Sequence, residues 1–218
     1  MTKAKHVVLI VMFFTGTVLA QSTTASKASS PKSQQAGAEQ PTTVSSALDR
    51  QLRGMEGEFV SGADAMPEDK YDFAPTSGEF SGVRKFGEQV RHMAATQYMV
   101  AAAILGEKPS AQLGEGDNAD NGPASMTAKT DIMKYLRDSF DYAHKAVNSI
   151  TPANQVQPIK GPFGGPRPTT RLALAVLLVG HGFDHYGQMV EYLRMNGIVP
   201  PASRPQPPPQ QPAQPPKQ

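Results

Sequence analysis

Four long segments in which apolar residues recur at helical spacing constrain the fold of this chain more than any other feature. They cover about residues 44–66, 83–105, 128–150 and 170–196, and each repeats large apolar residues at every third or fourth position. Between them we find no convincing strand pattern of alternating apolar and polar residues. Four amphipathic helices of similar length bury their apolar faces most economically side by side. The sequence therefore predicts an all-α fold, a four-helix bundle.

The helical spacing also predicts which residues face the core. In the first three segments they are Leu48, Leu52, Met55, Phe59 and Ala63, then Phe86, Val90, Met93, Gln97, Val100 and Ile104, then Ile132, Leu136, Phe140 or Ser139, Ala143 and Val147. We expect Thr127 to cap the third helix and Thr169 or Thr170 to cap the fourth, because a threonine hydroxyl accepts hydrogen bonds from the first turn. Gly197 is the expected stop of the fourth helix. The long loops before the third and fourth helices leave room for a crossover connection.

The first twenty residues, MTKAKHVVLIVMFFTGTVLA, have the pattern of a secretory signal peptide. Lys3 and Lys5 form a basic start, an apolar stretch follows, and small residues end the segment. The apolar stretch is short for a membrane-spanning helix, and an uncleaved membrane anchor is the alternative interpretation. We therefore expect an exported protein, periplasmic or extracellular, with no membrane contact after the signal peptide is cleaved.

Two segments that flank the helical region are expected to be disordered. Residues 21–42 are rich in Ser, Thr, Gln and Ala and hold scarcely any large apolar residue. Residues 200–218 form a proline-rich tail that is typical of an extended spacer, although such a tail can also dock in an aromatic groove. The remaining residues, 43–199, have the length of one domain.

Charge and cysteine content narrow the function classes. The full chain has 21 Lys and Arg against 19 Asp and Glu, and removal of residues 1–20 would take away two lysines and leave 19 of each. A chain without net charge gives no support to a phosphate-binding surface, so nucleic acid is not an expected partner. The chain has no cysteine, which excludes disulfides and a thiol nucleophile.

Two histidines lie four residues apart in the fourth helical segment. The helix face that carries them is apolar at both ends and polar in the middle, and its members are Leu174, Leu178, His181, His185, Gln188, Tyr192 and Met195. Two imidazoles one turn apart can aim their nitrogens at one point, which is how a helix supplies two ligands to a metal ion. A hydrogen-bonded histidine pair without an ion is the alternative.

A metal site needs a third ligand, and His92 in the second helical segment is the candidate. Alanines around it keep that helix slim, so a neighbouring helix can approach closely. Gly180, Gly182 and Gly187 flank the histidine pair although each glycine costs about 1 kcal/mol in a helix interior. Close backbone packing or room for a ligand would explain them.

Several other polar residues are assigned roles around this site. Glu88 and Asp184 are candidates to orient an imidazole, and surface charges are the alternative for both. We expect His144 to lie outside the site. Candidates for the lining of a ligand pocket are Tyr98, Gln188 and Tyr192.

These residues also carry a resemblance to a known family. The run HGFDHYGQMVEYLRMNGIVPPAS, with H-x3-H followed by x-G-Q and then Y-L-R-x-x-G, resembles the last helix of the DinB-like superfamily. The run AMPEDKYDFAPT and the later FGEQVRHMAATQYMV resemble its first-to-second helix region, with the single histidine of the second helix. The similarity covers about residues 44–202, and the three regions occur in order.

The resemblance implies a four-helix bundle in which three histidines bind one divalent metal ion. Carried over position by position, the ligands are His92, His181 and His185, and all three positions hold histidine here. Three nitrogen ligands leave a coordination position open to water or substrate. Zn, Ni, Fe and Mn all accept imidazoles, so ligand type does not choose among them.

The sequence leaves three functions open. The first is an exported metal-dependent enzyme that acts on a small molecule, a hydrolase or a thiol-type transferase, as the resemblance implies. The second is a non-catalytic module that binds a metal or ligand, and the third is a helical scaffold with an interaction tail. An oxidising compartment holds little reduced thiol, which disfavours thiol transfer. No acid–base pair or nucleophile motif identifies catalytic residues, and a homodimer is left open.

Overall fold

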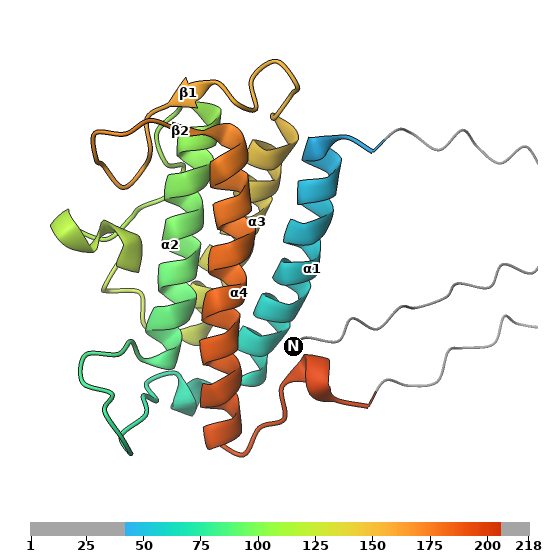
Figure 1. Ribbon diagram of the computed structural model, residues 1–218. Helices are drawn as coiled ribbons and strands as arrows, with labels where there is room; N and C mark the ends of the chain where they lie inside the picture. The colour runs from blue at the N-terminus through green and yellow to red at the C-terminus, as the bar shows by residue number, and fades with distance from the viewer. Residues whose placement is uncertain (1–41, 206–218) are drawn as a thin grey trace, which may run out of the picture. The chain divides into compact units, whose positions relative to one another are not determined.

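The described chain, residues 42–205 of a computed structural model, is a bundle of four long helices (Figure 1). They are α1 (Val44–Ala65), α2 (Phe86–Leu105), α3 (Lys129–Asn148) and α4 (Arg171–Met195). The predicted all-α four-helix fold is thus confirmed. The expected signal peptide, residues 1–20, lies outside the described residues, as do all but the last residue of the expected spacer and most of the proline-rich tail.

Each helix packs beside two others, and the order is not a simple up-and-down one. α1 lies against α3 and α4, and α2 lies against the same two helices. Ser45 donates a hydrogen bond to the carbonyl of Val147 (2.9 Å), so the start of α1 meets the end of α3. Arg171 donates to the carbonyl of Ile104 (2.9 Å), so α4 begins where α2 ends. Ser139 of α3 donates a hydrogen bond to Gln97 of α2, and Tyr142 one turn later donates to Glu107 just beyond α2, so α2 and α3 run parallel. Residues 106–128 form the crossover connection that this requires (Figure 1).

Short elements complete the described part of the chain. The 3-10 helices are η1 (Glu68–Lys70), η2 (Gly116–Asn121) and η3 (Pro201–Ser203). Strands β1 (Pro158–Ile159) and β2 (Thr169–Thr170) pair antiparallel just before α4. The sequence did not predict this pair, because two residues are too few to show an alternating pattern. Among residues 42–205, none of the helices combines the length and the apolar character that a membrane span needs.

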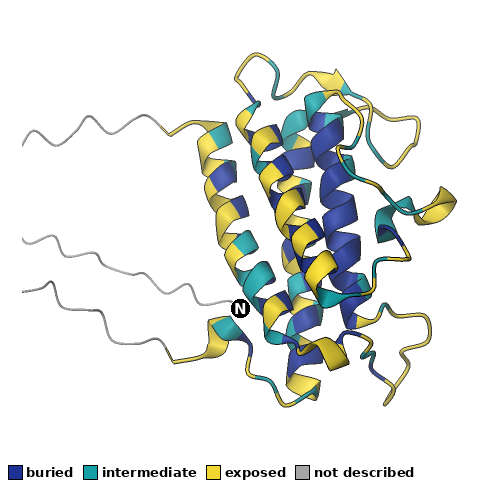
Figure 2. Ribbon diagram, turned by 180° about the vertical axis from the view of Figure 1, so that it is seen from behind, coloured by how far each residue is buried: buried dark blue, intermediate teal, exposed yellow. Residues whose placement is uncertain are grey.

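The core lies along the predicted apolar stripes. All the stripe residues of α2 and α3 are buried, and so are those of α1 except the partly buried Leu48. α2 is buried around nearly its whole circumference, because the crossover segment packs along it on the side away from α1 (Figure 2). On α4, the expectation that the face carrying the histidines points inward is wrong for Met195, which is 52% exposed although Tyr192 and Leu193 of the same turn are buried.

The helix ends agree with the sequence at some positions and differ at others. Thr170 caps α4, since its hydroxyl accepts a hydrogen bond from the amide of Ala173 (3.1 Å). The prediction of Thr127 as a cap is wrong: α3 begins after Ala128, whose side chain has no acceptor. Gly197 follows α4 with a φ of +71°, a left-handed conformation that favours glycine, as expected for a helix stop.

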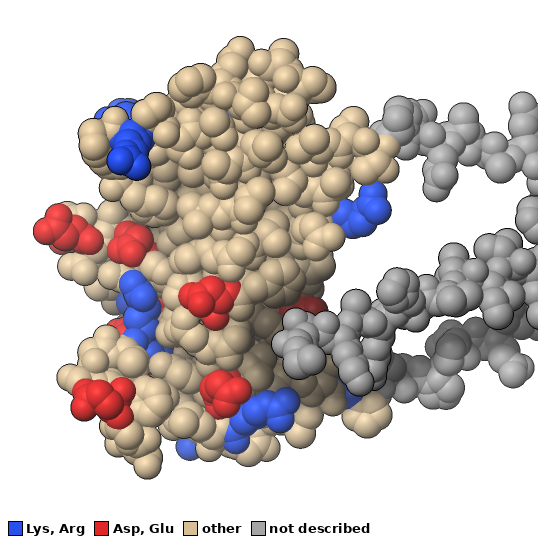
Figure 3. All heavy atoms as spheres, in the orientation of Figure 1, with Lys and Arg blue, Asp and Glu red and all other residues tan. Residues whose placement is uncertain are grey.

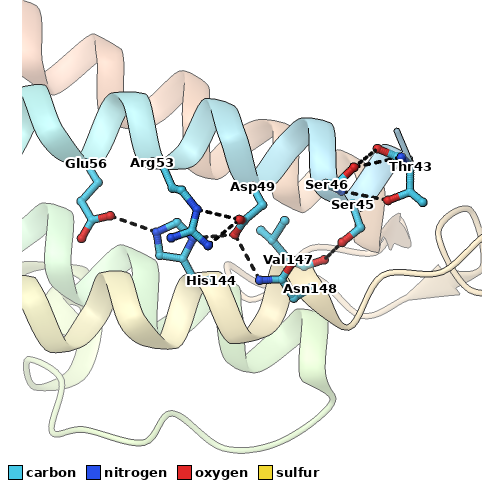
Figure 4. Close-up of polar contacts among 9 residues, drawn as sticks. All are labelled: Thr43, Ser45, Ser46, Asp49, Arg53, Glu56, His144, Val147 and Asn148. Carbon is cyan, nitrogen blue, oxygen red and sulfur yellow. Dashed lines mark hydrogen bonds and ion pairs between the residues drawn. The ribbon is translucent and has the colours of Figure 1, made fainter. Parts of the chain in front are cut away.

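A polar cluster fastens α1 to α3 (Figure 4). His144 on α3 lies between two carboxylates of α1, with Nδ1 2.6 Å from Asp49 and Nε2 3.0 Å from Glu56. Asn148 donates to Asp49 (3.1 Å), and Arg53 pairs with the same carboxylate (2.7 Å). Burial alone would raise the pKa of Asp49, but the hydrogen bonds from His144 and Arg53 outweigh it and lower the pKa. His144 therefore joins two helices and lies apart from the other described histidines.

Candidate metal centre

The two histidines of α4 meet at the middle of the bundle. His181 and His185 are one turn apart on the same helix face, and their Nε2 atoms are 3.0 Å from each other. Gly182 between them is buried against Met55 of α1, so the helix backbone lies close to its neighbour at this turn. Two nitrogens that each bind a tetrahedral zinc ion at about 2.0–2.1 Å are about 3.3 Å apart. The observed separation is close to that spacing.

His92 reaches the same point from α2. Its ring centroid is 5.2 Å from that of His181 and 4.7 Å from that of His185. One ring nitrogen from each of the three histidines lies within 4.8 Å of the other two. His92 and His185 are buried, and His181 is partly exposed. The three residues that the sequence predicted as ligands are thus brought together from two antiparallel helices.

The crossover segment orients the His92 ring. Nδ1 of His92 lies 2.7 Å from the main-chain carbonyl oxygen of Asp120, at the end of η2. A carbonyl oxygen only accepts, so Nδ1 carries the proton and donates, and Nε2 keeps its lone pair for another partner. Metal-binding histidines commonly donate their second nitrogen to an oxygen in this way. The Asp120 carboxylate, 3.5 Å from the same nitrogen, adds a negative charge behind the ring.

The three converging imidazoles form a donor set that could hold a divalent cation. The facing Nε2 atoms of His181 and His185 can share one proton at most. If neither Nε2 is protonated, the lone pairs of the two atoms face each other. Nδ1 of His185 is buried and has no hydrogen-bond partner within residues 42–205, so only the contact at Nε2 bears on its tautomer. A cation between the rings would satisfy all the converging lone pairs at once.

Burial keeps these imidazoles neutral. It lowers the pKa of His181 to about 4 and that of His185 to about 3, and the neighbouring imidazoles and the positive charge of Arg84 act in the same direction. Burial likewise lowers the pKa of His92, and Arg84 contributes there too, although the hydrogen bond to Asp120 opposes the shift. Metal ions bind the neutral form of histidine, so the rings are ready for a metal at neutral pH.

A cavity of about 950 Å³ is lined by residues about one helical turn from His92 and His185, and none of the three histidines is part of its wall. Its walls come from the start of α2, from segment 112–125 and from Gln188 of α4. Gln188 lies three residues after His185 and accepts a hydrogen bond from Gln89 (2.9 Å), which lies three residues before His92. The two amides therefore stand in the cavity wall about one helical turn from the histidines. A pocket of this size can hold a small molecule.

The structure corrects several expected roles. Glu88 accepts a hydrogen bond from the amide of Lys85 and so caps α2, and Asp184 is exposed and pairs with Gln188. Neither contacts an imidazole; the main-chain oxygen of Asp120 performs that task. The sequence could not identify it, because every residue in a loop offers the same carbonyl group.

Of the three expected pocket residues, only Gln188 lines the cavity. Tyr98 packs against Tyr135 and Tyr142 on the α2–α3 side, away from α4. Tyr192 donates a hydrogen bond to the carbonyl of Arg84 (3.1 Å) and so holds the turn before α2 to the end of α4. Arg84 and Arg91, which the sequence did not single out, stand in the cavity wall instead.

Fold and site together define a class, a four-helix bundle with three converging histidines between two antiparallel helices. A family model described as the DinB superfamily matches residues 51–189, and the chain belongs to this superfamily. It is also similar to the crystal structure of a DinB-like protein from Bacillus cereus ATCC 10987, with 18% sequence identity and a TM-score of 0.51. The match covers 71% of this chain and 93% of that one, and at this identity the likeness concerns the fold. No curated protein matched the chain.

Proposed function

We propose that the chain binds one divalent metal ion through His92, His181 and His185. The observation that carries the proposal is the convergence of the three rings, with one nitrogen from each within 4.8 Å of the others. The carbonyl of Asp120 holds His92 with its Nε2 free, and burial keeps all three rings neutral. A buried hydrogen-bonded histidine pair would need neither the third ring nor its orientation.

We further propose that this centre is catalytic and that its reaction is the hydrolysis of a small molecule. Three nitrogen ligands leave a position open, and a divalent ion in such a site lowers the pKa of bound water to about 7. Within the chain, Asp120 would keep His92 in place, and the Gln89–Gln188 pair would orient a substrate held in the 950 Å³ cavity. Thiol-type transfer at the same centre remains the second reaction to test.

Metal content tests the ligand assignment. The purified full chain should carry about one divalent ion, and His181→Ala should lose it, because two imidazoles alone hold a metal weakly. His144→Gln is the matched control, since it removes a histidine that lies with the carboxylates of α1 and should leave the metal content unchanged. Equal trace amounts in the wild type and both variants would refute the assignment.

Thermal unfolding gives a second measure of the same centre. A metal ion whose free concentration is 100 times its dissociation constant stabilises the folded state by about 2.7 kcal/mol. A chelator should therefore lower the unfolding midpoint of the wild type and of His144→Gln and leave that of His181→Ala unchanged. A wild-type midpoint that does not respond to the chelator would favour a metal-free histidine cluster.

Activity needs a separate assay. The metal-loaded chain should be screened against ester, amide and thiol-transfer substrates, with the metal-free chain and His181→Ala as blanks. Hydrolysis that depends on the metal and on His181 would support the proposed reaction. Metal binding without turnover of any substrate class would instead support a non-catalytic binding module.

We also propose that the chain is exported. The support is the sequence of residues 1–20, in which a basic start, an apolar stretch and small residues follow in the order that signal peptidase substrates have. N-terminal sequencing of the protein from a fractionated culture should find a chain beginning at Gln21 outside the cytoplasm. An intact Met1 in the membrane fraction would support the anchor interpretation, and an intact soluble cytoplasmic chain would refute export.

A further inference from the structure

Arg91 lines the 950 Å³ cavity and is only 8% exposed. Its Nε donates to the main-chain carbonyl of Asn121 (2.9 Å) and its Nη1 to that of Met126 (2.8 Å). Within residues 42–205, no carboxylate oxygen lies within 4.0 Å of its guanidinium. A buried charge usually has an ionic partner, because main-chain carbonyls offset only part of its lost hydration. Arg91 thus carries a buried positive charge in the cavity wall that no carboxylate of the described residues pairs with.

Gly122 shows how closely the crossover segment is fitted around this arginine. Its φ is +67°, and a Cβ built on it would lie 2.7 Å from Cγ of Arg91. The segment therefore lies directly on the stem of Arg91, and its carbonyls hold the guanidinium plane in one orientation. A fixed guanidinium matches the paired oxygens of a carboxylate or phosphate with little loss of conformational entropy on binding.

Arg84 stands in the same wall and is more accessible. About a third of its side chain is exposed, Nε donates to the side chain of Asn121 (2.8 Å), and Nη2 is 3.7 Å from the Asp120 carboxylate. Because Asp120 lies at that long distance and is also next to His92, it neutralises Arg84 only in part. The Asp120 carboxylate lies 3.7 Å from Arg84 and 3.5 Å from Nδ1 of His92, so Arg84 stands on the side of the cavity near His92.

Several of the remaining side chains in the wall are also polar. Gln89 is 3% exposed, and its Oε1 is buried without a hydrogen-bond partner in the described part of the chain. Two acids also line the cavity: Glu88 is engaged at the start of α2, and Glu115 is exposed on the opposite segment. Figure 3 shows acidic and basic side chains close together on the side of the molecule where η2 and the turn before α2 lie. Glu115 is exposed and Glu88 is hydrogen-bonded to the amide of Lys85, so neither acid pairs with the buried Arg91.

We propose that this cavity binds a small molecule through an oxyanion group, a carboxylate or a phosphate, held by Arg91 and Arg84. The polar part of the ligand next to its oxyanion would contact the Gln89–Gln188 pair, which lies about one helical turn from His92 and His185. The inference names the substrate class of the proposed metal centre, and in that respect it rests on the proposed function. The binding step itself involves no metal.

Solution NMR of the full chain tests the proposal. Inorganic phosphate and succinate are titrated separately at constant ionic strength into chelator-treated protein, and the side-chain Nε–H signals of Arg84 and Arg91 are followed. Either probe should move both signals along a saturable curve. A response to phosphate alone assigns a phosphoryl ligand, and a response to succinate alone assigns a carboxylate. No saturable change with either probe overturns the proposal.

Three variants separate the cavity from general charge effects. Arg84→Gln should weaken binding about tenfold or more, which is the size expected for one lost charge-assisted hydrogen bond. Arg50→Gln removes the same charge from an exposed position of α1 and should change the affinity less than twofold. Arg91→Gln should abolish saturation. Arg91→Gln also removes the hydrogen-bond donors of two carbonyls and can therefore unfold segment 112–126. If circular dichroism shows that it does, the result for Arg84→Gln decides the outcome. Equal effects of Arg84→Gln and Arg50→Gln would overturn the assignment.

Repeating the titration on metal-loaded protein distinguishes this inference from the proposed metal centre. Binding that saturates with and without metal supports the arginine site. Binding that needs the metal would place the oxyanion on the ion and overturn the arginine assignment. If the chain binds no metal and the oxyanion still binds, the proposed metal function fails and the cavity assignment stands.

Discussion

Gly182 offers a sharp test of how closely the histidine-bearing helix approaches its neighbour. A Cβ at this position would overlap Sδ and Cε of Met55 and lie 2.9 Å from its Cγ. Met55 is fully buried, so its thioether can make room for a Cβ only by moving among packed neighbours. Gly180 and Gly187, on the same helix, face open space, and a Cβ there would meet no atom within 4 Å. Alanine at the three positions should therefore have different effects.

The size of the difference follows from two opposing contributions. Replacing glycine with alanine in a helix stabilises it by up to about 1 kcal/mol. Forcing one extra carbon into a packed core costs about 1–3 kcal/mol. Gly180→Ala and Gly187→Ala should gain the first contribution alone, and Gly182→Ala carries both. We expect Gly182→Ala to be less stable than the two controls by about 1–3 kcal/mol.

Urea unfolding followed by circular dichroism measures this difference, with a chelator present so that metal binding does not contribute. With an m-value of about 1–3 kcal/mol/M, a difference of about 2 kcal/mol separates the midpoints by roughly 1 M. The m-values of the three variants should agree, because all unfold the same surface. If Gly182→Ala is as stable as Gly180→Ala, the close approach of α4 to Met55 is wrong, and the position of His181 and His185 is in doubt with it.

Three further predictions concern the titrating and buried polar groups. Asp49→Asn should destabilise the chain by about 1–3 kcal/mol at pH 7 in urea unfolding. Because the folded-state pKa of Asp49 is lowered, the penalty should shrink as the pH falls below 3.8. In the metal-free chain, NMR titration should find His181 and His185 neutral at pH 5. Since their folded-state pKa values, about 4 and about 3, lie below 6.5, their contribution to stability is present above pH 6.5 and falls toward pH 3. Tyr71→Phe, which removes a buried hydroxyl that donates to a carbonyl of α1, should cost about 1–2 kcal/mol in urea unfolding.

The fold could be predicted from the sequence where burial repeats along a helix and could not where single contacts decide. The spacing of Leu52, Met55 and Phe59 alone indicates one buried face, and all three are fully buried. Thr127 was expected as a cap because its type suits the role, but the chain enters α3 one residue later, where no side chain caps it. Likewise, Met195 continues the helical spacing of the α4 face, yet it is 52% exposed while Tyr192 of the same turn is buried.

The candidate site divides in the same way. The i,i+4 spacing of His181 and His185 indicates a shared helix face without knowledge of the fold. The approach of His92 depends on which helices are neighbours, which the sequence supported only through the alanines of the second helix and the family resemblance. The orientation of His92 depends on a main-chain carbonyl of a loop, and the significance of Arg91 depends on the absence of a carboxylate close to it. Neither property is encoded by residue type at a fixed spacing.

The crossover segment, residues 106–128, therefore determines more of the site than its irregular structure suggests. It spans the distance that lets α2 and α3 run parallel, and this places α2 antiparallel to α4, with His92 beside the α4 pair. The same segment covers α2, holds the His92 ring through Asp120 and forms one wall of the cavity with the carbonyls that fix Arg91. A shift of this segment would therefore change the imidazole orientation and the arginine wall together. Changes in the segment should accordingly alter metal affinity and oxyanion affinity in parallel, whereas changes in the β1–β2 connection should alter neither.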